Sequence, residues 1–336
     1  MPGSVITTYV DPHEYQKAVQ SADLQIYATG RGKFEATLTR ITLNRLRTQR
    51  ASLSVPAVTH SAVAKNRRII FLQFDPDQAP ILHSGIEIPP SDIVCYPLGS
   101  EHHYRTSTSY QCGGMSLTPE DFAALANALV GYEPAVPATM QVVRPPAALM
   151  SRLLTLHKAA CDLAATAPDL LEHPEVAKAM EQELVRAMIA CLADPATEER
   201  YRANRQRLMV MQRFEQMLEQ RQDESLYVTD VCADIGVSER ALRLHCQEQL
   251  GMGPHRYLWL RRMNLARRTL TLADATTKTV TEIANDSGFG ELGRFAVAYR
   301  TLFGESPSAR LCRVPNEPHK ENGPYLTAYR YLACSR

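Results

Sequence analysis

Three arginines in the last third of the chain occupy positions suited to reading DNA bases. Arg240 and Arg243 follow Gly236, and Arg294 follows Gly288 in a related stretch of sequence. A guanidinium group can donate two parallel hydrogen bonds to O6 and N7 of guanine in the major groove. The arginines can bind bases only if they lie on the exposed face of a helix. The sequence around them therefore decides whether they can do so.

The segments that carry these arginines form an internal repeat. Val228 to Val237 matches Val280 to Phe289 at an offset of 52 residues, and Leu242 to Leu258 matches Phe295 to Leu311 at an offset of 53. Each copy predicts a short helix, a glycine turn and a second helix. Such a pair is a helix–turn–helix, whose second helix enters the major groove. The expected helix N-caps are Thr229, Thr281 and Ser238.

A basic segment separates the two copies. Residues 255–272 predict one helix with five arginines and no acidic residue. At 1.5 Å per residue this helix is about 27 Å long. Its length favours two groove-binding helices near one DNA turn, about 34 Å, apart. We expect Arg261 and Arg262 of this helix to contact phosphates.

The helical period separates buried from outward positions in the second helix of each copy. Leu242 and Cys246 should face the core of the first copy, as should Phe295 and Tyr299 in the second. Apolar side chains on the outer face can touch thymine methyl groups, as we expect of Leu292 and Val297. The residues expected to face DNA are Ser238, Arg240, Arg243, Leu244, Gln247, Glu291, Leu292, Arg294 and Val297.

Residues 205–313 resemble the double helix–turn–helix domain of AraC/XylS-type transcriptional regulators. The motif that carries the resemblance is TVTEIANDSGFGELGRFAVAYRTLFGESPSARL, with Gly-Phe after the first helix and Phe-Gly-x-Ser-Pro near the end. The resemblance implies a sequence-specific regulator, an activator in most members, that binds promoter DNA and contacts RNA polymerase. It also implies an effector-binding domain that forms a homodimer. One departure is Cys246, where the family usually has an aromatic residue.

The first part of the chain is β-rich and then helical. Residues 20–118 contain short β-branched and aromatic segments bounded by turn residues, which favours a sandwich or small barrel. Helices are expected after the N-cap Thr118 and over residues 146–166 and 174–193. The expected fold is therefore α+β. It comprises a cupin-like β barrel with helices over residues 1–195, an all-α double helix–turn–helix domain over 200–313 and a tail over 314–336.

Basic residues gather in the β-rich region. If their side chains point into the barrel, they would bind an anionic effector such as a carboxylate metabolite or a nucleotide messenger. If they lie on exposed strand faces, they form no such site. The expected effector-binding residues are Arg45, Arg47, His60, Arg67 and Arg68.

Overall charge and composition exclude several classes of protein. The 336 residues include 37 Lys and Arg and 36 Asp and Glu, so the net charge is +1, which by itself neither favours nor excludes a nucleic-acid partner. Residues 221–314 contain 13 Lys and Arg and 11 Asp and Glu, so affinity for DNA should depend on dimerisation and a shaped fit rather than on bulk attraction to a polyanion. Neither a secretory signal nor an apolar run of about 20 residues is present, so we expect no membrane partner. Together with eight scattered cysteines, this favours a cytoplasmic protein with reduced thiols.

Signatures of catalysis and of cofactor binding are missing from the sequence. There is no GxSxG, no Walker glycine loop and no HExxH, so we expect neither an enzyme nor a cofactor. His83, Glu101, His102 and His103 are candidate metal ligands. Because the HxH arrangement of metal-binding barrels is lacking, we expect no metal site. The alternative function is a small-molecule-binding or enzymatic barrel fused to the DNA-binding domain.

Overall fold

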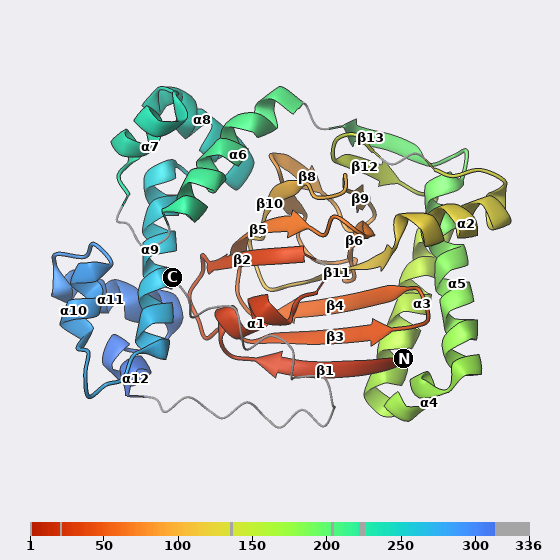
Figure 1. Ribbon diagram of the computed structural model, residues 1–336, viewed down its shortest axis with the longest axis horizontal. Coiled ribbons are helices and arrows are strands. Elements are labelled where there is room, and N and C mark those ends of the chain that lie inside the picture. The colour runs from red at the N-terminus through yellow and green to blue at the C-terminus, as the bar shows by residue number, and fades with distance from the viewer. Residues whose placement is uncertain (1, 21, 135–136, 203–204, 222–225, 313–336) are drawn as a thin grey trace, which may run out of the picture.

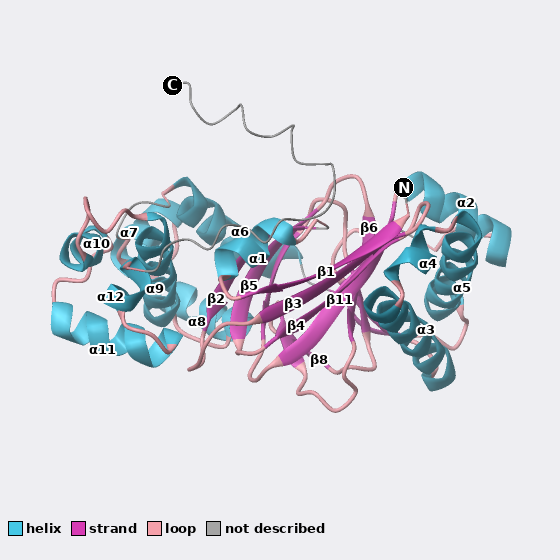
Figure 2. Ribbon diagram, turned by 90° about the horizontal axis from the view of Figure 1, so that it is seen from below, coloured by secondary structure: helices cyan, strands magenta, loops and turns pink. Residues whose placement is uncertain are grey.

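The computed structural model describes residues 2–20, 22–134, 137–202, 205–221 and 226–312. Two β-sheets lie at the centre of the molecule. Figures 1 and 2 show the helices of residues 119–193 at one end of the sheets and the helices of residues 205–311 at the other. The expected tail, residues 314–336, lies outside the described residues.

Eight antiparallel strands of the described chain form the larger sheet. They are β1 (Gly3–Tyr9), β3 (Ala36–Thr42), β4 (Arg47–Leu53), β6 (Arg68–Gln73), β9 (Ile93–Cys95), β11 (Tyr110–Leu117), β12 (Gln141–Arg144) and β13 (Glu198–Arg202). Their order is β1-β3-β4-β11-β6-β9-β12-β13. Both faces of this sheet are covered, because alternate residues of its strands enter two different apolar cores. In β6, for example, Ile69 and Phe71 face the smaller sheet while Ile70 and Leu72 face helices.

The smaller sheet faces the larger one. Its strands are β2 (Ala22–Ala28), β5 (Ala57–Val63), β7 (Ile81–His83), β8 (Ile86–Ile88) and β10 (Glu101–Arg105), in the order β2-β5-β10-β7-β8. Within the described ranges the two sheets pair separately and neither closes on itself. The N-terminal part is therefore a mixed α+β unit with a β-sandwich, and the expected closed cupin-like barrel is not confirmed.

Helices cover the outer face of the larger sheet. They are α2 (Pro119–Val130), α3 (Ala147–Thr166), α4 (Pro168–Glu172) and α5 (Pro174–Ala193), while the short α1 (Pro12–Ala18) connects β1 to β2. The expected N-cap Thr118 is confirmed, since its hydroxyl accepts a hydrogen bond from the Asp121 N–H at 3.1 Å. Leu153 and Leu184 are among the helix residues that complete the core against this sheet.

Seven helices follow the sandwich in the described chain. They are α6 (Arg205–Gln220), α7 (Val228–Ile235), α8 (Glu239–Leu250), α9 (Pro254–Leu272), α10 (Val280–Asp286), α11 (Leu292–Phe303) and α12 (Pro307–Leu311). They form two apolar cores. Tyr257 of α9 lies in the first core and Met263 of α9 lies in the second, so the two cores share one rigid element.

Two of the expected caps are wrong. Tyr227 precedes α7, so this helix begins at Val228 rather than after Thr229. Thr279 rather than Thr281 precedes α10, because it forms a capping box with Glu282: the Thr279 side chain accepts from the Glu282 N–H, and the Glu282 carboxylate accepts from the Thr279 N–H.

The C-terminal helices pack on the outer face of the smaller sheet. Tyr27 of β2 contacts Tyr257 of α9 edge to face, with ring centroids 5.8 Å apart. Arg105 of β10 donates a hydrogen bond from Nη1 to the carbonyl of Gly251, at the end of α8, at 2.9 Å. The sandwich and the C-terminal helices therefore share a buried interface.

Candidate nucleic-acid interface and effector pocket

The first helix–turn–helix is built from α7 and α8. Gly236 lies between them with φ +71°, a left-handed conformation that glycine adopts without strain. Ser238 then starts α8, and its side chain accepts a hydrogen bond from the Ala241 N–H at 3.2 Å. Leu242 and Cys246 of α8 are fully buried against α6 and α7, as expected. The opposite face of α8 is thereby turned to solvent.

The outer face of α8 carries the residues expected to contact DNA. Arg240, Arg243, Leu244 and Gln247 are all exposed, and 57% of the Leu244 surface is accessible. Leu244 is therefore accessible to a partner. Ser238 is exposed as well, but its hydroxyl oxygen already serves the helix N-terminus.

The second helix–turn–helix is built from α10 and α11. Phe295 and Tyr299 of α11 are buried, as expected. Val297 is 69% exposed, and Leu292, the first residue of α11, is 38% exposed. Arg294 Nη1 lies 3.0 Å from Oε1 of Glu291, and both side chains are largely exposed. Arg294 is thus accessible, and its ion pair with Glu291 is weakened by the surrounding solvent.

The two arginines of α9 expected at phosphates differ in position. Arg261 is only 3% exposed, and its Nη2 donates to the carbonyl of Leu218 in α6. It therefore joins α9 to α6 and is almost entirely withdrawn from solvent, which argues against the expected phosphate contact for this residue. Arg262 is half-buried and its guanidinium lies over the Phe289 ring, 5.4 Å from the centroid.

Arg256 was not among the residues expected at DNA, yet it is exposed at the start of α9. His255 beside it lies 3.5 Å from Glu239 at the start of α8. Arg256 thus follows a residue that contacts α8, while its own guanidinium lies over the Trp259 ring of α9, 4.3 Å from the centroid. The sequence indicates Arg256 only as a member of the basic segment. Periodicity alone does not distinguish this exposed arginine from the buried Arg261.

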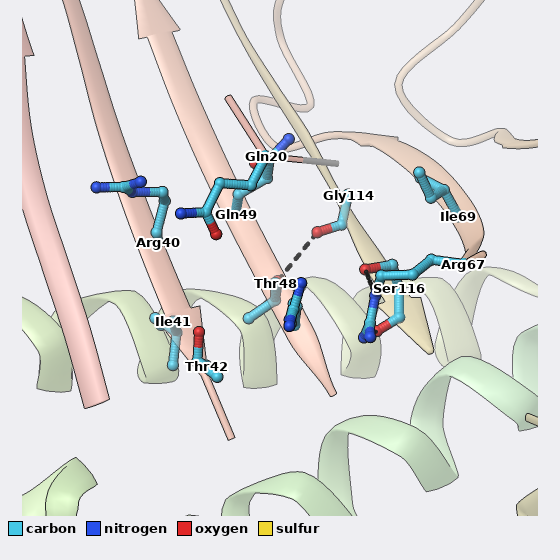
Figure 3. Close-up of a pocket in the computed structure, with 11 residues that line it drawn as sticks. Gln20, Arg40, Ile41, Thr42, Thr48, Gln49, Arg67, Ile69, Gly114 and Ser116 are labelled. Carbon is cyan, nitrogen blue, oxygen red and sulfur yellow. Dashed lines mark hydrogen bonds between the residues drawn. The ribbon is translucent and has the colours of Figure 1, made fainter. Parts of the chain in front are cut away.

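A small basic pocket lies on the larger sheet, over strands β3, β4 and β11. Arg40 of β3 and Arg67 line it, together with Gln20 and Gln49 (Figure 3). Arg47 of β4 is a third arginine in the lining. All the described residues that line the pocket are neutral or basic. Burial, and to a smaller extent the charge of Arg47, lower the pKa of Arg67, whereas the charge of Asp121 opposes them. The volume of the pocket is about 30 Å³, enough for a small anionic group but not for a whole nucleotide.

Neighbouring contacts hold two of the pocket arginines in place. Arg67 donates from Nε to the Ser116 hydroxyl at 3.0 Å and from Nη2 to the Arg45 carbonyl at 2.9 Å. Arg40 donates from Nη1 to the carbonyl of Ala18, the last residue of α1, at 3.2 Å. The pocket is therefore connected to α1.

The other residues expected to bind an effector lie elsewhere. Arg45 pairs with Glu181 of α5, and Arg68 pairs with Glu133 at 2.9 Å. His60 is buried on the outer face of the smaller sheet, near α6. Of the five expected residues the structure therefore brings together only Arg47 and Arg67, and it adds Arg40, whose position on the inner face of β3 is a consequence of strand register.

A second cavity of about 270 Å³ lies between α1, β2 and α9. Its lining combines acidic and basic side chains, among them Asp11, Lys17 and Arg268. Asp11 caps α1 and also accepts a hydrogen bond from Arg310 of α12. The same carboxylate lies 3.8 Å from Arg267 of α9. Helix α1 thus touches the basic pocket at its C-terminal end and the C-terminal helices at its N-terminal end.

No helix in the described ranges has the length and apolar character to cross a lipid bilayer.

Comparison with known proteins finds similarity in the C-terminal segment. Residues 231–311 match the family model of a helix-turn-helix domain. The chain is 44% identical over 98 residues to a probable thc operon regulatory protein of Rhodococcus erythropolis, covering 29% of this chain and 30% of that protein. It is 32% identical over 100 residues to the XylDLEGF operon transcriptional activator 2 of Pseudomonas putida, covering 30% of this chain and 64% of that protein.

The matched segment spans less than two thirds of the length of both relatives. Over a longer stretch, the chain aligns with the crystal structure of the AraC-like transcriptional activator CuxR. That alignment covers 84% of this chain and 99% of the other, at 14% identity and a TM-score of 0.40.

Proposed function

The chain belongs, through its C-terminal domain, to the AraC/XylS family of transcriptional regulators, and we propose that each monomer reads two successive major grooves of promoter DNA with α8 and α11. The observation that carries the proposal is that the expected DNA-facing side chains of both helices are exposed while their opposite faces are buried. Helix α9, which both apolar cores share, has 19 residues and is therefore about 28 Å long. This length supports a spacing near one DNA turn.

Within this proposal the side chains divide into two groups. Arg240, Arg243 and Arg294 read bases, because an arginine can pair with both acceptors of guanine. Arg256 and Arg262 contact phosphates, which fix the register without reading sequence. The remaining outward residues refine the fit through smaller contacts: Ser238, Leu244, Gln247, Glu291, Leu292 and Val297.

We further infer that the N-terminal part is an effector-binding domain whose ligand carries a carboxylate or phosphate group. Three arginines without an acidic neighbour in the lining support an anion in the basic pocket. The contacts of α1 supply a route from that pocket to α9 and α12. An effector regulates DNA binding only if its affinity differs between two arrangements of the domains, which is what this route would allow.

The relative from Pseudomonas putida, a transcriptional activator, also supports activation of transcription as the direction of regulation. From the family resemblance we propose that the chain forms a homodimer. We propose also that this homodimer contacts RNA polymerase when it activates transcription.

The DNA-reading proposal is tested by selecting binding sites from random duplexes with the full chain, followed by hydroxyl-radical footprinting. We expect two protected segments per monomer on one face of the duplex, about 10 base pairs apart. One protected segment per monomer would refute the two-groove arrangement, and the absence of any sequence preference would refute the function.

A further inference from the structure

Two histidines and one glutamate converge in the interface between the sandwich and the C-terminal helices. They are His60 of β5, His103 of β10 and Glu215 of α6. One ligand atom from each lies within 4.8 Å of the others, and all three residues are buried. His103 Nε2 and Glu215 Oε1 are 2.9 Å apart. No described residue gives either of these two atoms a hydrogen bond of good geometry.

The sheet register creates the histidine pair. His60 and His103 are direct cross-strand partners in the antiparallel β5–β10 ladder, and their rings stack at 4.6 Å. Both side chains point away from the sandwich core, on the face that also carries Val58 and Arg105. His102, the next residue along β10, points the other way and stacks on Tyr96 at 4.1 Å. The pair therefore belongs to the outer face, where α6 brings Glu215.

The donor atoms suit a metal ion. All three side chains are buried, and each offers a ligand atom to the same space between β5, β10 and α6. Imidazole nitrogen and carboxylate oxygen are donor types that bind divalent transition metals.

The geometry points to a divalent first-row transition-metal site of the Zn²⁺ type, and we propose that His60 Nε2, His103 Nε2 and Glu215 Oε1 are its protein ligands. In a tetrahedral site, ligand atoms that each lie about 2.1 Å from the ion lie about 3.4 Å from one another. The present separations, 2.9 Å for one pair and within 4.8 Å for all, reach this value by small side-chain rotations.

A fourth ligand is available at the edge of the cluster. Glu101 Oε2 lies 4.0 Å from His60 Nε2, and its side chain is 26% exposed. It can complete the tetrahedron directly or through a water molecule, and its exposure provides a path by which an ion enters. Hard cations such as Mg²⁺ prefer oxygen ligands, so the two imidazoles favour Zn²⁺ over Mg²⁺.

The site joins two parts of the protein. Two ligands come from the sandwich and the third comes from α6, the first helix of the C-terminal unit. Metal binding therefore stabilises the docked arrangement of the two parts, by an amount that grows with the ratio of free metal to its dissociation constant. This role is independent of which ligand occupies the basic pocket and of which DNA sequence is read.

The test uses the full chain after removal of metal with a chelator. Zn²⁺ is added, excess metal is removed by gel filtration, and bound metal is counted by mass spectrometry; Co²⁺ is used in parallel for its visible absorption. We expect one ion per chain and the intense absorption of tetrahedral Co²⁺. The absence of both from the wild-type chain overturns the proposal, whether or not any variant folds.

Variants show which side chains are responsible. Glu215→Gln keeps the size of the side chain, and His103→Asn removes the second ligand; each should weaken Zn²⁺ binding by about tenfold or more, on the scale known for perturbed metal sites. His102→Asn is the matched control, because His102 lies on the same strand but faces away. Folding is checked by circular dichroism. Equal affinity in folded Glu215→Gln and in the wild-type chain overturns the assignment.

Discussion

Asp11 at the start of α1 accepts a hydrogen bond from Arg310 of α12, although 299 positions separate them in the sequence. The Asp11 side chain is only 15% exposed and that of Arg310 only 6%. This contact joins the two ends of the described chain at the domain interface.

Replacing Asp11 with asparagine should loosen this junction. Asparagine caps a helix as well as aspartate does, so α1 should persist while the ionic contacts with Arg267 and Arg310 weaken. We expect the free energy of unfolding to fall by about 1–3 kcal/mol, the scale of a hydrogen bond to a charged group. Urea denaturation measures it. Asp23→Asn, at an exposed position of the same cavity, is the control, and equal stability of the two variants would contradict the prediction.

Replacing Arg243 with alanine should weaken binding to the selected DNA site by about 1–3 kcal/mol and relax the preference at one base position. The side chain is exposed on α8, so folding should be unaffected. Mobility-shift titrations at fixed salt measure the affinity. Arg186→Ala removes an exposed arginine of α5, at the opposite end of the molecule in Figure 1, and should leave binding unchanged. A loss of the same size in both variants would indicate a general charge effect instead of base reading.

Replacing Arg47 with alanine should abolish stabilisation by the anionic effector. Small carboxylates and nucleoside phosphates are screened for a rise in melting temperature of the full chain, and the strongest compound is titrated against variants. We expect the rise to disappear in Arg47→Ala and to persist in Arg45→Ala, because Arg45 pairs with Glu181 outside the pocket. If Arg268→Ala removes the effect while Arg47→Ala does not, the effector binds in the cavity between α1 and α9.

Replacing Glu181 with alanine should destabilise the sandwich. Its carboxylate accepts hydrogen bonds from the N–H groups of Arg45 at 2.6 Å and Leu46 at 3.1 Å, in the turn between β3 and β4. Losing both leaves the buried N–H of Leu46 and the partly buried N–H of Arg45 without this partner, at a cost of about 2–5 kcal/mol in the free energy of unfolding. Glu183→Ala, on the exposed side of α5, should cost less than about 1 kcal/mol. Chemical denaturation compares the two, and similar losses would show that Glu181 has no special role.

The unfolding free energy should fall as pH drops below about 6.5, the ordinary pKa of histidine. Burial, aided by Arg50, lowers the pKa of His157 in the folded chain to about 3. Between these two values the unfolded chain binds a proton that the folded chain does not, so stability is lost as pH falls. Each histidine whose pKa is lowered in this way changes the free energy of unfolding by about 1.4 kcal/mol per pH unit in this range. His157→Gln should therefore reduce the slope measured between pH 6 and pH 5 by roughly that amount; an unchanged slope would show that His157 is protonated in the folded state.

The C-terminal half of the fold follows from local signals. The repeat, its two glycine turns and the helix over residues 254–272 depend on contacts between near neighbours, which periodicity records directly. The buried pairs Leu242 with Cys246 and Phe295 with Tyr299 were correct for the same reason.

The remaining predictions depended on contacts between residues far apart in the sequence, and these could not be predicted. Arg45 and Arg68 were expected in an effector site, but their partners Glu181 and Glu133 lie 136 and 65 positions away, beyond any local pattern. Arg261 was expected at the surface, but α9 is covered by two cores and by α6, so more than one of its faces is buried. The open sandwich differs from the expected barrel because edge pairing between distant strands leaves no trace in composition.

The packing of the C-terminal helices on the smaller sheet has a practical consequence for dissection of the protein. Tyr27 and Val58 of the sandwich are buried in a core otherwise made by α6 to α9. A fragment that ends before α6 would expose this apolar surface to water, and such truncated chains would be prone to stick to one another. Self-association of an isolated N-terminal fragment would then report the missing half of an intramolecular contact, and would be poor grounds for assigning the natural subunit arrangement.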